Sequence, residues 1–180
     1  MKYKNSLKTR KAIKRVYSEL IHEKKDIKKI TVKEIVERAG ISKSTFYTHY
    51  GNIYDVSIDF ESEILLVVEN LLNEYSNNNR VGFVEYFNKL LNIMKENEEL
   101  YKNILTAEIP GQFIDKLKEI LKQAILKDNY TKTLSTDINK KQIQATFLAN
   151  GLIYMLVDYF KGEMGLTIDE LNEAVVSLIR

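Results

Sequence analysis

The sequence predicts an all-α protein. Apolar residues recur at the three- and four-residue spacing of a helix face over nearly the whole chain of 180 residues. One proline and seven glycines interrupt this pattern, so a helix is forced to end at few places. Ser, Thr and Asn residues stand directly before several apolar segments, in the position of helix N-caps. Together these observations favour a series of amphipathic helices.

The first predicted helix covers about residues 5–24. Ile13, Val16, Tyr17 and Leu20 follow the i, i+3, i+4, i+7 pattern of one helix face. The cations of the segment lie mostly off that face. We therefore expect a helix with one buried side and one basic side.

The second predicted helix has both a start signal and a stop signal. Thr31 can cap it, and Glu34 can reach back three residues to complete a capping box, with Ile30 and Ile35 as the hydrophobic staple. Gly40 tolerates the left-handed conformation that often ends a helix. This short helix is therefore expected to run from Thr31 to Gly40.

A third short helix is predicted in the stretch 41–50. Ser42 is an N-cap candidate, and Phe46 and Tyr50 fall on one side of the helix. Consecutive Thr, Phe and Tyr residues would also suit a strand, but the stretch lacks the alternation of apolar and polar residues that a half-buried strand needs. Two short helices joined by a turn containing Gly predict a helix-turn-helix motif over about residues 31–50.

Further helices are predicted after the motif. Asn52 can cap a helix over about residues 52–75, which is long enough to link two domains. Thr167 and Glu170 form a second capping box before the last helix. The other predicted ranges are about 80–96, 98–107, 111–127, 138–161 and 168–180.

The charge of the chain is unevenly distributed. Residues 1–50 contain 14 Lys or Arg against 5 Asp or Glu, whereas residues 51–180 contain 13 against 20. The first segment therefore carries a net charge of +9 and the second −7, which accounts for the total of +2. A basic N-terminal segment indicates a polyanionic partner such as nucleic acid, although a solvated lysine-rich surface would have the same composition.

The residue inventory argues against an enzyme and against a metal site. The chain has no cysteine, and His22 and His49 are far apart in sequence. It has no glycine-rich phosphate loop and no recognisable pair of catalytic carboxylates. Ser44 and His49, five residues apart, point about 140° apart on a helix and so do not form a nucleophile and its base. We expect no enzymatic activity and no cofactor.

Neither a membrane span nor a secretory signal is expected. No apolar run approaches the roughly 18 residues of a transmembrane helix, and the first residues lack the apolar core of a signal peptide. A chain without cysteine also fits a reducing compartment. We expect a cytoplasmic protein without membrane association.

A helical wheel of the third helix separates a buried side from a side that can face DNA. Lys43 is the best candidate for a contact to guanine, and Thr45 can place its methyl group against that of thymine. Tyr47 and His49 suit phosphate oxygens, but His49 could also pack locally. The outward or flanking residues are Lys43, Ser44, Thr45, Tyr47 and Thr48.

The stretch "ITVKEIVERAGISKSTFYTHYGNIYDV", together with the order of the helices, strongly resembles the tetracycline-repressor (TetR/AcrR) family of bacterial transcriptional regulators. The family pattern runs from a Thr-capped helix through Ala-Gly-aliphatic-Ser to a Thr-aromatic-Tyr recognition helix, and the match covers about residues 8–60. The resemblance implies a helix-turn-helix DNA-binding domain at 1–51 and a helical ligand-binding and dimerisation domain at 52–180, with 52–75 as the linking helix. It places Thr31 and Lys33 at phosphates, although Lys33 could equally be a solvated lysine. The predicted DNA-binding residues are Thr31, Lys33, Lys43, Ser44, Thr45, Tyr47, Thr48 and His49.

One position departs from the family pattern. After Asn52 the family commonly has a Lys that contacts phosphate, and here Ile53 stands in its place. The resemblance therefore implies a weaker or differently placed backbone contact, which Lys2, Lys4 and Lys8 could offset.

The resemblance also implies partners for the C-terminal segment. Members of the family form homodimers, bind palindromic double-stranded operators in the bacterial cytoplasm, where DNA-bound protein is nucleoid-associated, and in many cases release DNA when a small molecule binds. We expect a repressor with a small hydrophobic or aromatic effector; the alternative is a dimeric regulator without such a ligand, controlled by a protein partner or acting constitutively. The pocket candidates are Phe83, Tyr86, Phe87, Tyr101, Phe113, Phe147 and Tyr154, any of which could instead be plain core. The dimer-interface candidates are Leu148, Gly151, Leu152, Met155, Tyr159, Leu171, Val175 and Leu178.

Overall fold

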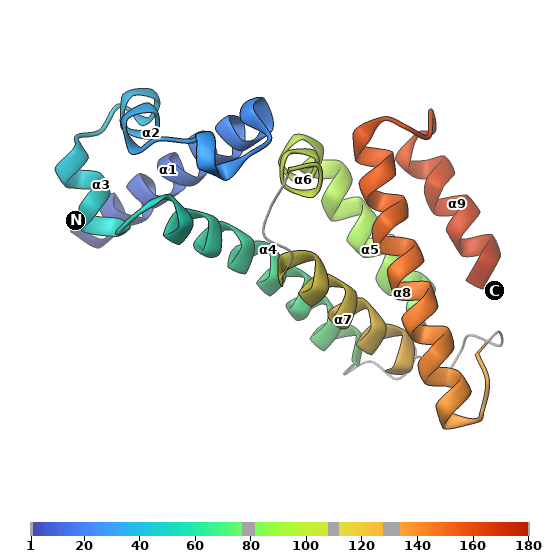
Figure 1. Cartoon of the computed structure of the whole chain (residues 1–180). Helices are drawn as coiled ribbons and strands as arrows, with labels where there is room; N and C mark the ends of the chain where they lie inside the picture. Colours follow the sequence, from blue (N-terminus) through green and yellow to red (C-terminus); the bar gives the residue numbers. More distant parts are fainter. Residues whose placement is uncertain (1, 77–81, 108–111, 128–133, 180) are drawn as a thin grey trace. The chain divides into compact units, whose positions relative to one another are not determined.

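The computed structural model describes residues 2–76, 82–107, 112–127 and 134–179. The regular secondary structure of these residues consists of helices (Figure 1), which confirms the all-α prediction. Within the same ranges, no helix combines the length and the apolar character needed to cross a bilayer. The chain divides into two compact units, one formed by Met1–Ile64 with Lys102–Pro110 and the other by Leu65–Tyr101 with Gly111–Arg180.

The first unit contains the predicted helix-turn-helix. Its elements are α1 (Lys2–Lys24), the short 3₁₀-helix η1 (Ile27–Lys29), α2 (Val32–Ala39), α3 (Lys43–His49), the first half of α4 (Ile53–Ser76) and the end of α6 (Glu98–Leu105). Helix α2 packs against both α1 and α3. The side chains of Ile13, Tyr17, Leu20, Ile35 and Phe46 are fully buried and form the core that holds the three N-terminal helices together.

The start and stop signals of α2 act as predicted. Thr31 Oγ1 accepts a hydrogen bond from the N–H of Glu34 (3.3 Å), and Glu34 Oε2 accepts one from the N–H of Thr31 (3.0 Å), which completes the capping box. Gly40 adopts the left-handed conformation with φ 64°. Ser42 then caps α3 by accepting from the N–H of Thr45. The geometry of the turn is therefore specified by residues within it.

Replacing Gly40 by Ala should lower the free energy of unfolding by about 1 kcal/mol, because a Cβ in the left-handed region meets its own carbonyl. No neighbouring atom lies within 4 Å of the added Cβ, so the cost is confined to the backbone. Asn92→Ala is the control, because Asn92 is exposed inside α5, where Ala is the better helix former. Denaturant unfolding of both variants checks this, and equal changes would contradict it.

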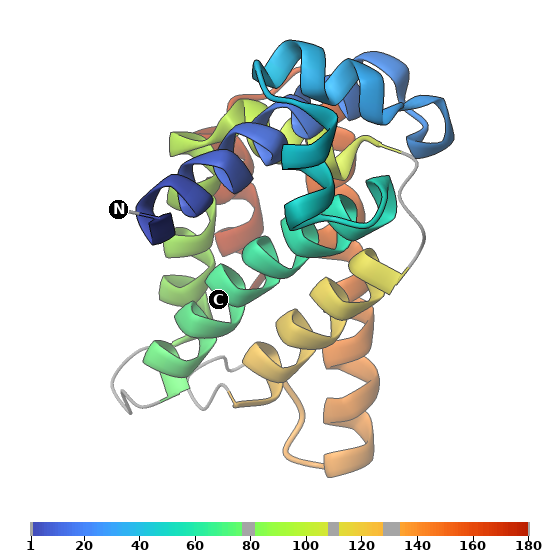
Figure 2. The same cartoon turned by 90° about the vertical axis from the view of Figure 1, so that its left-hand side faces the viewer.

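The second unit contains the remaining helices. They are α5 (Phe83–Glu96), α7 (Gln112–Lys127), α8 (Ile138–Lys161) and α9 (Ile168–Ile179), together with the second half of α4 and the start of α6. Helix α7 packs along α8, as Figure 2 shows, and α5 contacts both α7 and α9. The predicted capping box of Thr167 and Glu170 forms at the start of α9. Each long helix thus contributes its apolar side to one core.

Two features at the end of α1 were not predicted from the sequence. Lys25 has a positive φ of 58° although it is not a glycine, and its N–H donates to the carbonyl of Ile21 (2.8 Å). Asp26 then caps η1 by accepting from the N–H of Lys28 (2.9 Å). This turn fixes the backbone between α1 and α2, and it places Lys28 and Lys29 on the surface.

Candidate DNA-binding surface

Helix α3 presents one buried and one exposed side. Phe46 is fully buried and Tyr50 is 5% exposed, and their rings lie 5.9 Å apart between centroids. Tyr47 is 57% exposed on the other side, where its ring makes an edge contact with that of Phe46 (5.5 Å). Lys43, Ser44 and Thr48 are also exposed, whereas Thr45 and His49 are half-buried.

The hydroxyl groups at the start of α3 are partly engaged with one another. Ser42 Oγ lies 2.8 Å from both Ser44 Oγ and Thr45 Oγ1, and Thr48 Oγ1 donates to the carbonyl of Ser44 (2.9 Å). These bonds fix the side-chain rotamers and leave lone pairs that can accept from a base edge, and the O–H groups can donate to a base after a small rotation. The hydroxyl side is therefore preorganised rather than loose.

The two predicted phosphate-contact residues on α2 differ in how freely they can reach a ligand. Besides accepting in the capping box, Thr31 Oγ1 donates to Glu34 Oε2 (2.8 Å). Lys33 Nζ is 3.9 Å from Glu37 Oε1, and both side chains are well exposed, so this ion pair is weak and can open. Lys33 is thus available as a cation, whereas the hydroxyl of Thr31 is engaged in capping α2.

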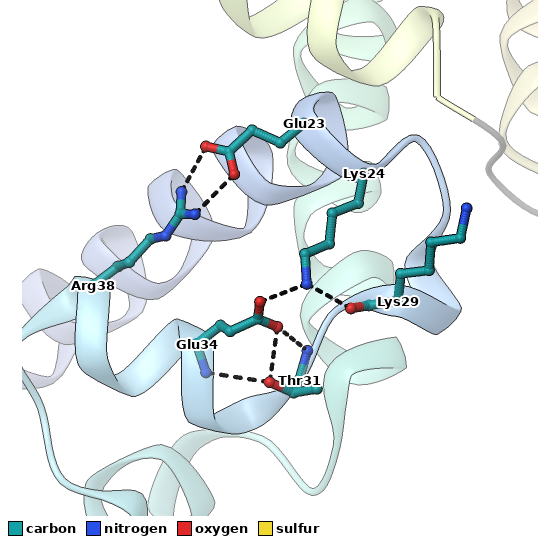
Figure 3. Close-up of polar contacts among 6 residues, drawn as sticks. All are labelled: Glu23, Lys24, Lys29, Thr31, Glu34 and Arg38. Atoms are coloured by element: carbon teal, nitrogen blue, oxygen red, sulfur yellow. Dashed lines mark hydrogen bonds and ion pairs between the residues drawn. The ribbon is translucent and has the colours of Figure 1, made fainter.

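A cluster of ion pairs ties α2 to α1 (Figure 3). Lys24 Nζ lies 2.5 Å from Glu34 Oε1 and donates to the carbonyl of Lys29 (2.7 Å). Arg38 makes a two-pronged ion pair with Glu23 at 2.6 and 2.8 Å. The hydrogen bonds from Lys24 and Thr31 lower the pKa of Glu34 to about 2. Glu34 therefore stays ionised at any physiological pH and continues to hold both helices.

A second cluster fixes the end of α3. The hydroxyl of Tyr50 donates to Asp59 Oδ2 (2.6 Å), while Arg10 and Lys14 from α1 pair with the same carboxylate at 2.6 and 3.1 Å. Arg10 also lies over the Tyr50 ring, 5.5 Å from its centroid. Burial disfavours the charge on Asp59, but the hydrogen bonds from Tyr50, Arg10 and Lys14 outweigh it and lower its pKa to about 2. One carboxylate thus joins α1, α3 and α4.

The start of α4 has an apolar residue where the family resemblance implies a cation. Ile53 is 8% exposed and follows Asn52, whose Oδ1 accepts from the N–H of Asp55 (3.2 Å). The carboxylate of Asp55 in turn accepts from the N–H of Gly51 (2.8 Å). The side chains of Lys2 and Lys4 lie outside the described residues, and that of Lys8 is exposed on α1.

The aromatic pocket candidates fall into two groups. Phe83, Tyr86, Phe87, Tyr101 and Phe113 are at most 3% exposed in the core of the second unit. The side chains of Phe147 and Tyr154 on α8 are instead 77% and 56% exposed, which does not suit residues that line a cavity within one chain.

The interface candidates also divide by burial. Gly151 and Leu178 are exposed, and Leu148, Met155 and Tyr159 are half-buried, whereas Leu152, Leu171 and Val175 lie in the core of their own chain. An exposed stripe on α8 is formed by Ile143, Phe147, Gly151 and Tyr154, which succeed one another at spacings of three or four residues. Ile143 is not among the residues predicted from the sequence, although its spacing of four residues from Phe147 is a signal for it.

Known proteins resemble the chain over both units. Residues 20–56 match the family model described as bacterial regulatory proteins, tetR family, and residues 83–180 match the one described as transcriptional regulator C-terminal region. The second match alone covers more than half of the chain. No curated protein matches the sequence.

Solved structures of similar fold extend over nearly the whole chain. A TetR transcriptional regulator from Streptococcus agalactiae 2603V has a TM-score of 0.71 at 21% identity, and the match covers 99% of this chain and 97% of that one. A transcriptional regulator from Aquifex aeolicus VF5 has a TM-score of 0.73 at 19% identity, with 96% and 99% covered. A gamma-butyrolactone receptor has a TM-score of 0.64 at 18% identity, with 85% and 82% covered. At these identities the likeness shows the fold.

Proposed function

We propose that this chain, which belongs to the tetR family of bacterial transcriptional regulators, binds a palindromic DNA operator as a homodimer and acts as a repressor that a small molecule releases. DNA recognition is assigned to residues 1–51, and regulation and dimerisation to residues 52–180. The observation that carries the DNA-binding part is the exposed side of α3, where Lys43 and Tyr47 project beside a fixed set of hydroxyl groups. A side chain as large as Tyr47 that is more than half exposed has no role in the core, and a phosphate partner explains it.

The homodimer is supported by the exposed stripe on α8. Isolated exposed apolar residues are common on protein surfaces, but Ile143, Phe147 and Tyr154 lie on one side of one helix. A Cβ at Gly151, in the same stripe, would meet no atom within 4 Å, so a second helix can approach the backbone closely there. We therefore assign Phe147 and Tyr154 to the dimer interface rather than to an effector pocket.

The effector part of the proposal is supported by the aromatic core of the second unit. Tyr86 is fully buried among the rings of Tyr75 and Phe83, 5.6 and 5.9 Å away between centroids. Its hydroxyl has no hydrogen-bond partner within the described part of the chain, which is a costly state for a buried donor. An aromatic effector with a hydrogen-bond acceptor would satisfy it. In the alternative, a regulator without a small-molecule ligand, the same aromatic residues form a closed core.

A thermal-shift screen of small aromatic acceptors separates these two alternatives. The effector proposal expects compounds that raise the melting temperature of the wild type, with a smaller rise for Tyr86→Phe, which keeps the ring but lacks the donor. A reporter gene under the control of an operator that the protein binds then tests repression and its release by the same compound. Compounds that stabilise both proteins equally would contradict the role of Tyr86.

The DNA-binding surface is tested by two substitutions on α3. Tyr47→Ala should weaken binding to all duplexes alike, because a phosphate contact does not depend on sequence, while Lys43→Ala should relax the preference at one or two base pairs, worth about 1–3 kcal/mol each. Operator selection from random DNA, followed by affinity measurements on both variants, checks this division. An equal loss of sequence preference from the two substitutions would contradict it.

A further inference from the structure

An open cleft of about 290 Å³ lies beside α3 in the first unit. Its buried lining residues are Ile27 of η1, Ile30, which is the C-cap of η1, and Ile53 at the start of α4, and all three are aliphatic. Its exposed lining residues include Lys28, Tyr47, Asn52 and Tyr54. Tyr47 of the recognition helix therefore forms one edge of the cleft, and Lys28, which is not among the predicted DNA-binding residues, forms another.

Lys28 belongs to the cations of the first unit that have no carboxylate partner among the described residues. Arg10, Lys14, Arg15, Lys24 and Arg38 all pair with carboxylates of the same unit at 3.1 Å or less. Among the described residues, no carboxylate lies within 4.0 Å of the ammonium groups of Lys8, Lys11, Lys28, Lys29 or Lys43, whereas Lys33 is held only by its long pair with Glu37. The positive charge that is free to bind DNA phosphates is thus smaller than the composition suggests. Of the lysines without a carboxylate partner named above, Lys28 is the one that lines the cleft.

Hydrogen bonds fix the backbone around Lys28 and therefore the point from which its side chain extends. The N–H of Lys28 donates to Asp26 Oδ1 (2.9 Å), and the η1 turn closes with the N–H of Ile30 on the carbonyl of Ile27 (3.1 Å). Asp55 follows the lining residue Tyr54 in the chain, and its carboxylate accepts from the N–H of Gly51 and from the side-chain amide of Asn52. Its charge is therefore partly compensated, and an anion can approach Lys28.

We propose that this cleft binds a phosphate group of the DNA backbone, with Lys28 as its cation and the hydroxyl groups of Tyr47 and Tyr54 as additional donors. The aliphatic lining of the cleft suits the carbon atoms of the adjoining deoxyribose. Ile53, which stands where the family pattern commonly has a Lys, lines the same cleft. Lys28 of η1 would therefore supply the cation that the start of α4 lacks. This inference rests on the proposed function, because it names a further contact made by the same DNA-binding surface.

The test compares Lys28→Ala with Lys29→Ala on the full-length protein. Lys29 is the matched control, since it is the next residue of η1, also exposed and without an ion pair among the described residues, but it does not line the cleft. Affinity for the operator and for an unrelated duplex of equal length is measured over a range of salt concentrations. We expect Lys28→Ala to lower the slope of log affinity against log salt by about 0.9 for each bound subunit, on both duplexes alike, because one phosphate contact is lost. Lys29→Ala should change it by much less.

Two further variants make the result specific to the cleft. Lys28→Arg should keep the wild-type slope, and adding Ile53→Lys to Lys28→Ala should restore it, because the new ammonium group enters the same cleft. Equal slopes for Lys28→Ala and Lys29→Ala, or a loss confined to the operator, would overturn the proposed phosphate contact while leaving the DNA-binding function intact. A wild-type protein that binds neither duplex in a salt-dependent manner would contradict the DNA-binding function itself.

Discussion

Replacing Phe147 by Glu is expected to convert the homodimer into a monomer and to lower operator affinity by at least about 100-fold. In a twofold-symmetric interface each substitution occurs twice, and losing a central aromatic contact costs about 2 kcal/mol or more per copy. The dimer dissociation constant should therefore rise by about three orders of magnitude. Phe147 is 77% exposed in the single chain, so the substitution should leave the fold of the protomer unchanged.

Sedimentation velocity over a range of protein concentrations measures this effect. Ile58→Glu is the matched control, because Ile58 is 62% exposed on α4, a helix that does not carry the stripe, and the same charge should leave the dimer intact there. A Phe147→Glu protein that remains dimeric at micromolar concentration would show that the stripe is not the interface.

Replacing Asp59 by Asn should lower the free energy of unfolding by about 2 kcal/mol at neutral pH. The folded protein holds the pKa of Asp59 at about 2, below its ordinary value of 3.8, and this difference corresponds to about 2 kcal/mol favouring the folded state. Since the folded pKa is depressed, the stabilisation is fully present above about pH 4 and is lost as the pH falls towards 2. Wild type and Asp59→Asn should therefore converge in stability over this range.

Urea unfolding at several pH values between 2 and 7 tests the pH window. Glu19→Gln is a suitable control, because the Arg15–Glu19 pair is exposed and should contribute less than about 1 kcal/mol at any pH. A constant difference between wild type and Asp59→Asn down to pH 2 would show that the ionised carboxylate is not the cause. Operator affinity should also fall in Asp59→Asn, because the neutral amide would hold the hydroxyl of Tyr50 more weakly at the end of α3 and would no longer pair with Arg10 and Lys14.

The helix-turn-helix was predictable because its signals are local. The caps at Thr31 and Ser42 and the left-handed Gly40 act within three or four residues of themselves, which is the range that a sequence pattern covers. The turn at Lys25 was missed because a lysine gives no sign of a positive φ. The ion pairs of Asp59 were missed because their partners on α1 are more than 40 residues away in the chain.

The C-terminal residues show a different limit of the sequence analysis. An apolar residue at helical spacing can face its own core or a second subunit, and the spacing is the same in both cases. Leu152 and Phe147 both belong to such a pattern, yet Leu152 is 6% exposed and Phe147 is 77% exposed. The direction of each stripe depends on how α7 packs along α8, which no single helix specifies.

In the first unit, a cationic side chain that forms an ion pair with a carboxylate stabilises the fold but is then not available to bind a DNA phosphate. An arginine such as Arg38 that neutralises Glu23 cannot also neutralise a phosphate without breaking the pair. Removing the carboxylate, as in Glu23→Gln, should therefore release a cation to the DNA and tighten binding to every sequence, while it loosens the link between α1 and α2. A regulator that needs to leave non-specific DNA quickly is helped by carboxylates that keep its arginines occupied, and here those carboxylates are part of the fold.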